Sequence, residues 1–374
     1  MKKKLHLVSF DVPYPANYGG IIDVFYKIKT LHLLDVEIYL HVFDYGKGKQ
    51  AELENYCKQI YYYPRNSYLK SFFDPEIPFI VKSRGNDDLI KNLKSKKIPI
   101  LFDGLHTTYV LSLTTFVGHK IYVRAHNVEH SFYDGLFKSE TNGFKKMFYK
   151  EERKKLKKYE EILKKVDGIF SISPYEQEYF LRNYGKKSHY IPAFHDVSEK
   201  KQSLSKKGKI ILFHGNLKVA ENMAAAIFLI NIFKETSFNF VIASSFENKT
   251  VLKSISATNN ITFKKLTSDE DLHVLFKQAH INVLTSFQKT GIKLKLINAL
   301  RQSRFVIAND FIMDDTGLET IIEKANSKKE FLQKTSMLFN RDFSEAVMKE
   351  RAEKLTDIHP LKSAKKMAEI IFML

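Results

Sequence analysis

Short apolar runs rich in β-branched and aromatic residues alternate with stretches whose apolar residues recur at helical spacing, and this alternation constrains the fold of the chain most. In the first half of the chain we expect helices at 21–34 and 87–93. Strands are expected at 4–10, 36–43, 59–63, 98–103, 120–125 and 168–173. Strands that alternate with helices in this way predict a parallel sheet with crossover helices.

The alternation stops and then begins again. Residues 191–195 end the first run, and 196–208 are polar, charged and without period, which is typical of a linker. Further strands are expected at 209–214, 239–243, 261–264, 281–285 and 305–308, and further helices at 221–233, 269–277, 291–302 and 328–338. We therefore predict an α/β protein with two doubly wound domains, 1–195 and 206–357, that face a cleft, and a final helix in 358–374 that crosses back to the first domain.

A long basic stretch, 144–166, has one apolar stripe in a background of Lys and Glu and predicts a further helix. Two roles remain open for it. It can lie on a membrane surface, or it can be a solvated helix that covers the sheet, which its Glu–Lys pairs at helical spacing favour.

The net charge of +18, from 60 Lys and Arg against 42 Asp and Glu, admits several partners. Nucleic acid is not expected, because the chain has no zinc knuckle, RNP-like aromatic run or glycine-arginine tract. An anionic membrane surface and a site for an anionic donor both remain. The single cysteine, Cys57, excludes an internal disulfide, and we find neither a signal-peptide core nor a bilayer-spanning run, so we expect a cytoplasmic protein.

The first candidate site follows the first expected strand, where Asn17 precedes Gly19 and Gly20. Glycines at a strand-to-helix junction allow backbone amides to approach a ligand and direct a helix N-terminus at anionic groups. The segment is not a GxGxxG fingerprint, and no P-loop occurs, so a dinucleotide enzyme and a P-loop NTPase are not supported. A purely structural turn is the alternative.

Polar residues also follow two later strands of the first half. Arg124, His126, Asn127 and Glu129 lie at the end of the strand at 120–125, and His106 follows the strand at 98–103. Side chains at the carboxyl edge of a sheet can contact a sugar hydroxyl or a developing charge. We assign His126 as the catalytic residue and the others, together with Asn17, to a pocket for the acceptor or the sugar, while a histidine that satisfies a loop is the alternative.

In the second half, Thr290 and Gly291 are expected to start a helix after a strand, with Ile292, Lys293 and Lys295 on its first turns. Oriented amides, a positive helix end and nearby cations suit a diphosphate. A capped amphipathic helix with its lysines in solvent is the alternative. A second candidate for the same ligand follows the first strand of this half and comprises Gly215, Asn216 and Lys218.

The sequence Asp269-Glu270-Asp271 matches the DxD pattern, which binds a metal ion and a diphosphate in other proteins. Here Ser268 or Asp269 is expected to cap the following helix instead. We predict no metal site.

Together these segments resemble the retaining GT-B glycosyltransferases of the family 4-like group, whose fold has two Rossmann-like domains. The resemblance spans nearly the whole chain and includes SPYEQ at 173–177. A group of Bacteroidetes mannosyltransferase-like members is similar in FDVPYPANYGG at 10–20, RAHNVEH at 124–130, HGNL at 214–217 and TGIKLKL at 290–296. The resemblance implies a retaining, metal-independent transfer without a cofactor, with Gly19 and Gly20 beside the donor phosphates and His126 beside the transferred sugar.

The chain departs from the pattern of this family in the donor-binding half. Thr290 and Asn298 stand where better-studied members carry two glutamates, and Asn216 and Asn222 stand where they carry an Arg/Lys pair. We hypothesise that Lys293 and Lys295 supply the missing charge.

The resemblance thus implies a hexosyltransferase that uses a nucleotide-diphosphate sugar, with mannose as the candidate sugar. The expected acceptor is a glycan or lipid-linked sugar in cell-surface polysaccharide or lipopolysaccharide biosynthesis, reached by peripheral contact with the inner membrane. Two alternatives remain open. The missing glutamates suggest a catalytically inactive or regulatory GT-B protein, and the fold also serves sugar-nucleotide epimerases.

Overall fold

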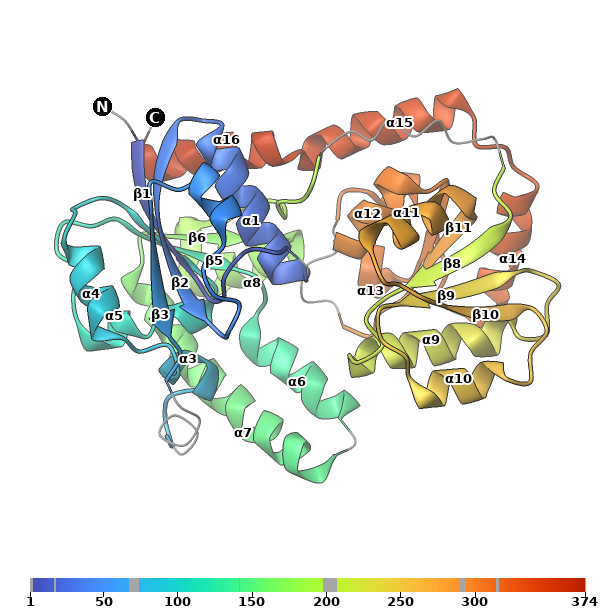
Figure 1. Ribbon diagram of the computed structural model, residues 1–374, viewed down its shortest axis with the longest axis horizontal. Coiled ribbons are helices and arrows are strands. Elements are labelled where there is room, and N and C mark those ends of the chain that lie inside the picture. The colour runs from blue at the N-terminus through green and yellow to red at the C-terminus, as the bar shows by residue number, and fades with distance from the viewer. Residues whose placement is uncertain are drawn as a thin grey trace. The chain divides into compact units, whose positions relative to one another are not determined.

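The computed structural model describes residues 3–16, 18–66, 74–140, 142–197, 207–288, 294–313 and 316–373. The chain divides into two compact units (Figure 1). The first contains the chain up to Val197 and resumes at Ile358, and the second is built from the segment between them.

The first unit is built on a parallel sheet of seven strands in the order β3-β2-β1-β4-β5-β6-β7. The strands are β1 (Lys3–Ser9), β2 (Val36–Asp44), β3 (Gln59–Pro64), β4 (Ile100–Asp103), β5 (Ile121–Ala125), β6 (Gly168–Ser171) and β7 (Ser188–Tyr190). The central strands are buried along nearly their whole length, which explains why they are continuous apolar runs in the sequence.

Helices cover both faces of this sheet. On one face, α1 (Gly19–His32) and α16 (Pro360–Phe372) pack side by side over Leu5, Leu7 and Ile38 (Figure 1). The opposite face, with Val8 and Phe102, is covered by α4 (Asp87–Lys94), α5 (Val110–Leu113) and α7 (Gly143–Tyr159). The remaining helices of the unit are α3 (Phe79–Lys82), α6 (Glu129–Ser139) and α8 (Pro174–Tyr184).

The second unit repeats this plan with six parallel strands in the order β10-β9-β8-β11-β12-β13. They are β8 (Ile210–His214), β9 (Phe240–Ser244), β10 (Ile261–Lys265), β11 (Ala279–Leu284), β12 (Phe305–Ala308) and β13 (Glu323–Lys324). The helices are α9 (Ala220–Phe233), α10 (Lys249–Ile255), α11 (Asp269–Gln278), α12 (Leu294–Gln302), α13 (Asp310–Met313), α14 (Lys328–Phe339) and α15 (Glu345–Leu355). The core lies where α9 and α14 pack on Phe213, Ile242 and Ile307.

Two parallel sheets with helices confirm the predicted α/β class and its Rossmann-like arrangement. The predicted cap of α11 is also confirmed: Ser268 forms a capping box with Asp271, whose carboxylate accepts the Ser268 amide at 2.9 Å. The Asp271 carboxylate is thus used to cap the N-terminus of α11.

The basic helix predicted at 144–166 ends earlier in the structure than expected. Helix α7 stops at Tyr159, and residues Glu160–Lys165 form a 3-10 helix. Glu160 is buried and accepts from the Tyr179 hydroxyl at 2.5 Å, which ties this turn to α8. The stretch also covers the sheet, since Leu156 and Leu163 are buried in the core of the first unit.

The C-terminal helix α16 belongs structurally to the first unit. Ala364, Met367 and Ile371 are buried against its core. The Tyr122 hydroxyl on β5 donates to the carbonyl of Ile370 at 3.1 Å, and Lys366 Nζ donates to the carbonyl of Tyr190 at 3.0 Å. The last helix therefore completes the core that the N-terminal strands begin.

Candidate functional site

The strand order of each unit reverses beside its first strand, between β1 and β4 in the first unit and between β8 and β11 in the second. Ligands of open parallel sheets bind at the carboxyl ends of the strands near such a reversal. The described candidate residues follow these ends: Gly19 and Gly20 after β1, His106 after β4, His126 after β5 and Gly215 after β8.

Directly beneath this edge, the first unit contains a buried network of ion pairs. Asp23 and Lys27 on α1 are fully buried and lie 3.1 Å apart, Oδ2 to Nζ. Lys27 Nζ also lies 2.6 Å from Asp103 Oδ1 at the end of β4. Arg124 on β5 contacts Asp23 through Nη2 at 2.8 Å and Nε at 3.2 Å. The network joins one helix to two strands of the sheet.

The charges of this network balance, because two carboxylates face an ammonium and a guanidinium. Burial alone would raise the pKa of Asp23, but Arg124 and Lys27 outweigh it and hold that pKa far below its usual range. The backbone amide of Phe194 also donates to Asp23, at 2.8 Å.

His126 is attached to this network. Its Nε2 lies 3.0 Å from Asp103 Oδ1, an oxygen that also accepts from Lys27. Since the carboxylate oxygen is the acceptor, Nε2 carries the proton and a neutral ring has its lone pair on Nδ1. Nδ1 has no hydrogen-bond partner among the described residues and lies 3.9 Å from Asp23 Oδ2. The ring is buried, with a side-chain exposure of 5%.

Asp23, Asp103 and His126 each offer one possible metal-ligand atom, and these atoms lie within 4.8 Å of one another. The ammonium of Lys27 contacts both carboxylates, and Arg124 contacts Asp23 as well. Their negative charge is already offset, so the arrangement suits an ion-pair network better than a cation site.

Arg124 occupies a different place from the acceptor pocket that we predicted for it. Its side chain is fully buried. Besides Asp23, its guanidinium donates to the carbonyls of Ile191 at 2.6 Å, Ser171 at 3.3 Å and Pro192 at 3.2 Å. These contacts hold the segment after β7 against the sheet, which is a structural role.

The Asp23–Lys27 pair was missed by sequence reasoning. Both residues lie at i, i+4 on the face of α1 that also carries Ile21, Val24 and Ile28, which are all buried. Charged residues of opposite sign within a buried apolar stripe were the available signal, since such charges are buried only when they are paired.

Above the network, the ring of Phe10 contacts several candidate residues. A Cβ added at Gly20 would lie 2.7 Å from Phe10 Cζ, so only glycine fits at this start of α1. The Phe10 ring packs edge-on against His106 at 4.8 Å and against His126 at 5.7 Å, centroid to centroid. Gly20, His106 and His126 thus meet around one aromatic side chain.

His106 faces Glu129, the first residue of α6, with 3.8 Å between Nδ1 and Oε1. Burial raises the pKa of Glu129 to about 7, although Asn127, 3.5 Å from Oε1 through Nδ2, lowers it slightly. Burial also lowers the pKa of His106 well below its usual value, and the charge of Arg84 adds to this effect. At neutral pH, His106 is therefore a neutral imidazole, and the carboxyl of Glu129 beside it is partly protonated.

In the second unit, Lys295 on α12 reaches the end of β8. A Cβ added at Gly215 would lie 3.0 Å from Lys295 Nζ and 3.3 Å from Asn222 Cγ. Lys295 Nζ donates to Asn222 Oδ1, and Asn222 Nδ2 donates to the carbonyl of Asn216 at 2.9 Å. Burial and the Lys295 charge lower the pKa of His214 to about 3. The predicted residues 215, 216 and 295 therefore lie together.

Lys218 turns to a different neighbour. Its Nζ lies 3.8 Å from the centroid of the Phe246 ring, a cation–π contact at the end of β9. Its backbone amide donates to Asn216 Oδ1 at 2.9 Å, which shapes the turn after β8. Asn298, one turn after Lys295 on α12, is half-buried. Asn17 and residues 289–293, with Thr290, Gly291, Ile292 and Lys293, lie outside the described residues.

A carboxylate that sequence reasoning missed holds the chain as it leaves β11. Glu221 at the start of α9 accepts from the Ser286 hydroxyl and, at 3.2 Å, from the Phe287 amide. Asn309 accepts from the Ser286 amide at 3.1 Å and donates to the Ser286 carbonyl at 2.7 Å. Residues 286 and 287 are thereby fixed beside the first turn of α9.

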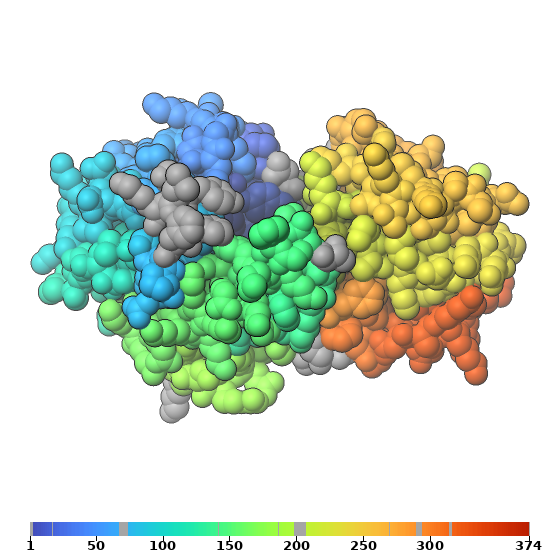
Figure 2. All heavy atoms as spheres, turned by 90° about the horizontal axis from the view of Figure 1, so that it is seen from below, coloured from blue at the N-terminus to red at the C-terminus, as the bar shows by residue number. Residues whose placement is uncertain are grey.

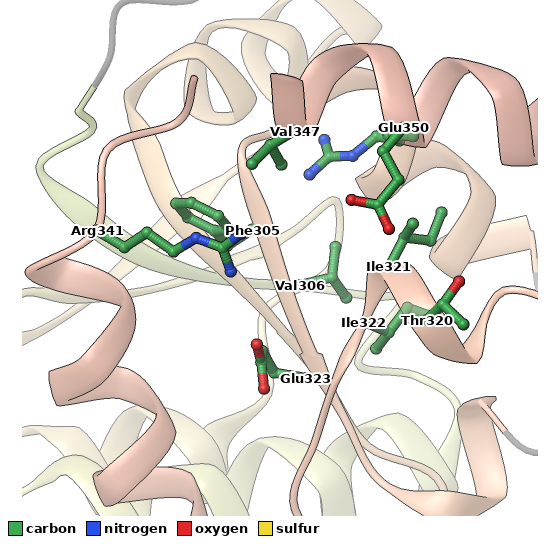
Figure 3. Close-up of a pocket in the computed structure, with 10 residues that line it drawn as sticks. Phe305, Val306, Thr320, Ile321, Ile322, Glu323, Arg341, Val347 and Glu350 are labelled. Carbon is green, nitrogen blue, oxygen red and sulfur yellow. The ribbon is translucent and has the colours of Figure 1, made fainter. Parts of the chain in front are cut away.

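A small pocket of about 50 Å³ lies elsewhere in the second unit, between β12, β13 and α15 (Figure 3). Phe305, Ile322, Glu323, Arg341 and Glu350 are among its lining residues. Arg341 extends along the Phe305 ring, 5.5 Å from its centroid. None of the predicted site residues lines this pocket.

Replacing Asp23 by Asn should destabilise the first unit by about 3 kcal/mol, because Arg124 and Lys27 would lose a buried carboxylate. The pKa of Asp23 is lower in the folded state than its ordinary 3.8. Its contribution is therefore complete above pH 3.8 and is lost as the pH falls toward the lower folded value. In urea unfolding between pH 3 and 7, the free energy of unfolding of Asp23→Asn should fall less toward acid pH than that of the wild type.

The matched control is Asp35→Asn, since Asp35 is exposed and its positive φ of 57° also suits asparagine. It should retain the wild-type pH profile. Equal stability of Asp23→Asn and wild type at pH 7 would contradict a stabilising role of the network.

Comparison with known proteins agrees with this fold. Residues 208–341 match the family model of the glycosyl transferases group 1. An uncharacterized 44.6 kDa protein in the cps region of Klebsiella pneumoniae is 28% identical over 333 residues, which cover 84% of each chain.

Solved structures are similar over almost the whole chain. TarM aligns with a TM-score of 0.70 at 14% identity and covers 99% of both chains. Sucrose-phosphate synthase from Thermosynechococcus elongatus aligns with a TM-score of 0.68 at 13% identity over 99% of this chain and 98% of that one. Anabaena HepE, solved in complex with UDP and glucose, aligns with a TM-score of 0.64 at 10% identity over 100% of both chains. Residues 208–341 are thus similar to the glycosyl transferases group 1, and the two units have the GT-B fold of two Rossmann-like domains.

Proposed function

We propose that the protein transfers a hexose from a nucleoside diphosphate sugar to a glycan or lipid-linked acceptor, with retention at the anomeric carbon. The second unit binds the donor and the first binds the acceptor. The observation that carries the proposal is the position of Lys295 over Gly215, inside the segment that matches the glycosyl transferase family.

The donor end of β8 has the chemistry that a diphosphate requires. Gly215 leaves space for a phosphate near Lys295 Nζ, because any side chain there would press against the ammonium. Helix α9 begins at Ala220, and helix N-termini bind anionic groups through their free amides. Lys295 takes the place of the Arg/Lys pair that Asn216 and Asn222 replace, and we propose that Lys293 assists it.

Transfer breaks the bond between the anomeric carbon and the diphosphate oxygen and forms a bond to the acceptor oxygen on the same face of the sugar. The acceptor proton leaves with the departing phosphate. Lys295 stabilises the diphosphate as its charge builds, and the remaining contribution of the protein is to position the two reactants. We place His126 beside the transferred sugar, where its hydrogen bond to Asp103 fixes the orientation of the ring.

The relatives support the same class of substrates. HepE was solved with UDP and glucose, which supports a nucleotide-sugar donor. The relative from Klebsiella pneumoniae is named for the cps region, which supports a role in polysaccharide biosynthesis. We further propose that the transferred sugar is mannose and that transfer requires no metal ion.

The first experiment incubates the protein with pooled nucleotide sugars and with lipid-linked or soluble glycan acceptors. We expect release of one nucleoside diphosphate, and a new glycosidic bond whose anomeric configuration, read by NMR, matches that of the donor. Release of no nucleotide from any pool would favour an inactive or regulatory protein. Conversion of a nucleotide sugar to its epimer without an acceptor would favour an epimerase.

Replacing Lys295 by Met should weaken binding of the preferred nucleoside diphosphate by about tenfold or more, because a charge-assisted contact to phosphate is lost. A thermal-shift screen with UDP, GDP, ADP, CMP and dTDP identifies the base, and calorimetry then measures the affinity. Lys293→Ala should weaken the same binding.

The control for these lysine variants is Lys253→Met on α10, whose side chain is exposed. It should bind the nucleotide as the wild type does. Unchanged affinity in Lys295→Met would discard the assignment of the diphosphate to the end of β8.

We also propose that the protein contacts an anionic membrane surface through the tip of the α6–α7 hairpin. Figure 2 shows these two helices in green on one face of the first unit. Phe144 and Met147 are exposed by 92% and 63% and lie at i, i+3 on α7, next to the exposed Lys145 and Lys150. Exposed apolar side chains among lysines suit the headgroup region of anionic lipids. In the described part of the chain, no helix has the length and apolar character needed to cross a bilayer.

The double variant Phe144→Ser/Met147→Ser should reduce binding to vesicles of phosphatidylglycerol and phosphatidylcholine by about tenfold, because two apolar anchors are removed. Vesicle flotation measures the bound fraction. Val117→Ser removes an equally exposed apolar residue outside the hairpin and should bind as the wild type does. Equal binding by the hairpin variant would contradict this contact.

A further inference from the structure

Arg84, after helix α3, places a guanidinium in a buried position without a carboxylate. Its relative exposure is 6%. Nε donates to the Phe10 carbonyl at 3.2 Å, Nη1 donates to the Ile80 carbonyl, and Nη2 donates to the Tyr45 hydroxyl. Burial raises the pKa of Tyr45, so this hydroxyl is neutral. All three acceptors are therefore uncharged, and no ion pair of Arg84 occurs among the described residues.

Two other buried arginines contact either a carboxylate or carbonyls at the end of a helix. Arg124 is paired with Asp23. Arg351 donates to the carbonyls of Leu300 at 3.0 Å and Ser303 at 2.5 Å, where the negative end of helix α12 faces it. Arg84 has neither kind of partner, because the carbonyl of Ile80 belongs to a helix of only four residues. A guanidinium has more donors than these contacts use, and a buried uncompensated charge is costly.

A second guanidinium adds to the positive charge. Arg65, directly after β3, is half-buried, and its Cζ lies 4.9 Å from the centroid of the Tyr45 ring. Arg84 Cζ lies 5.5 Å from the same centroid. Burial lowers the pKa of Arg84 to about 10, and the charge of Arg65 contributes to this shift. Two like charges around one ring repel each other unless an anion joins them.

The acidic groups nearby do not supply that anion. Asp11 is already paired with Lys47, with 3.0 Å between Oδ2 and Nζ, and it accepts from the Tyr18 hydroxyl at 2.8 Å. Glu129 is only partly ionised at neutral pH, since burial raises its pKa to about 7, and so it offsets only part of the positive charge. The region therefore retains a positive charge.

The location is that of a ligand site. Phe10, Tyr45 and Arg65 follow the carboxyl ends of β1, β2 and β3, and the Phe10 ring contacts His106 and His126. We propose that Arg65 and Arg84 form an anion-binding subsite that receives a carboxylate or phosphate group of the acceptor. The paired N–H groups of a guanidinium match both of these groups. This inference rests on the proposed function, because it assigns the chemistry of the acceptor that the first unit binds.

The test compares three small probes by calorimetry in the presence of the preferred nucleoside diphosphate: methyl β-glucuronide, glucose 6-phosphate and the neutral methyl β-glucoside. The wild type should bind at least one anionic probe about tenfold more tightly than the neutral one, and the tighter of the two distinguishes a carboxylate from a phosphate acceptor. Equal binding of all three probes would overturn the proposal.

Arg65→Gln should abolish this preference without changing nucleotide affinity, and Arg84→Lys, which keeps the charge but not the fork, should reduce it. Arg182→Gln is the matched control, because the Arg182 side chain is 75% exposed. A preference that survives in Arg65→Gln and Arg84→Lys, or that disappears only in Lys295→Met, would overturn the subsite. Nucleotide binding and donor turnover in Arg65→Gln test the transferase activity separately.

Discussion

The pairing of Asp23 with Lys27 and Arg124 is the interaction on which the first unit depends. These charges lie between α1 and the sheet, at the point where the strand order reverses. Because they are buried, each is stable only while its partners are in place. The same network fixes Asp103 and, through it, the orientation of the His126 ring. The packing of one helix and the orientation of the histidine beside the proposed sugar site are thus parts of one arrangement.

The two proposed anion sites, one in each unit, are built in different ways. In the second unit, Lys295 lies at a glycine in the segment shared with the glycosyl transferase family. In the first unit, arginines gather around an aromatic ring at the ends of β2 and β3. The diphosphate is the same in every nucleoside diphosphate sugar, which fits a site within the segment shared with the family. The acceptor varies between pathways, which fits a subsite outside that segment.

Much of the fold could be predicted from the sequence. Buried parallel strands are continuous apolar runs, so β1, β2, β8 and β12 are visible as such. Helix α6 was missed because a glycine and polar residues interrupt its apolar pattern, and β7 and β13 are too short to show a period. The end of α7 was placed too late, because the 3-10 turn that follows it continues the same composition.

The site was predicted less completely. Glycines at strand ends and the lysine on α12 are local signals, and residues 215, 216 and 295 lie together as expected. Contacts between distant segments, such as Lys27 with Asp103 or Arg84 with Phe10, depend on the tertiary fold and leave no spacing in the sequence. Arg124 was therefore assigned to a pocket, although it is a buried partner of α1.

The position of Phe10 has a consequence for the way specificity can change. Its ring lies under Gly20 and against two histidines, while its carbonyl holds Arg84. A substitution of Phe10 that alters the surface beside Arg65 and Arg84 would therefore also alter the packing around His126. If the proposed sites are correct, Phe10 links recognition of the acceptor to placement of the sugar, and new acceptor preferences would have to evolve by substitutions that leave Phe10 unchanged.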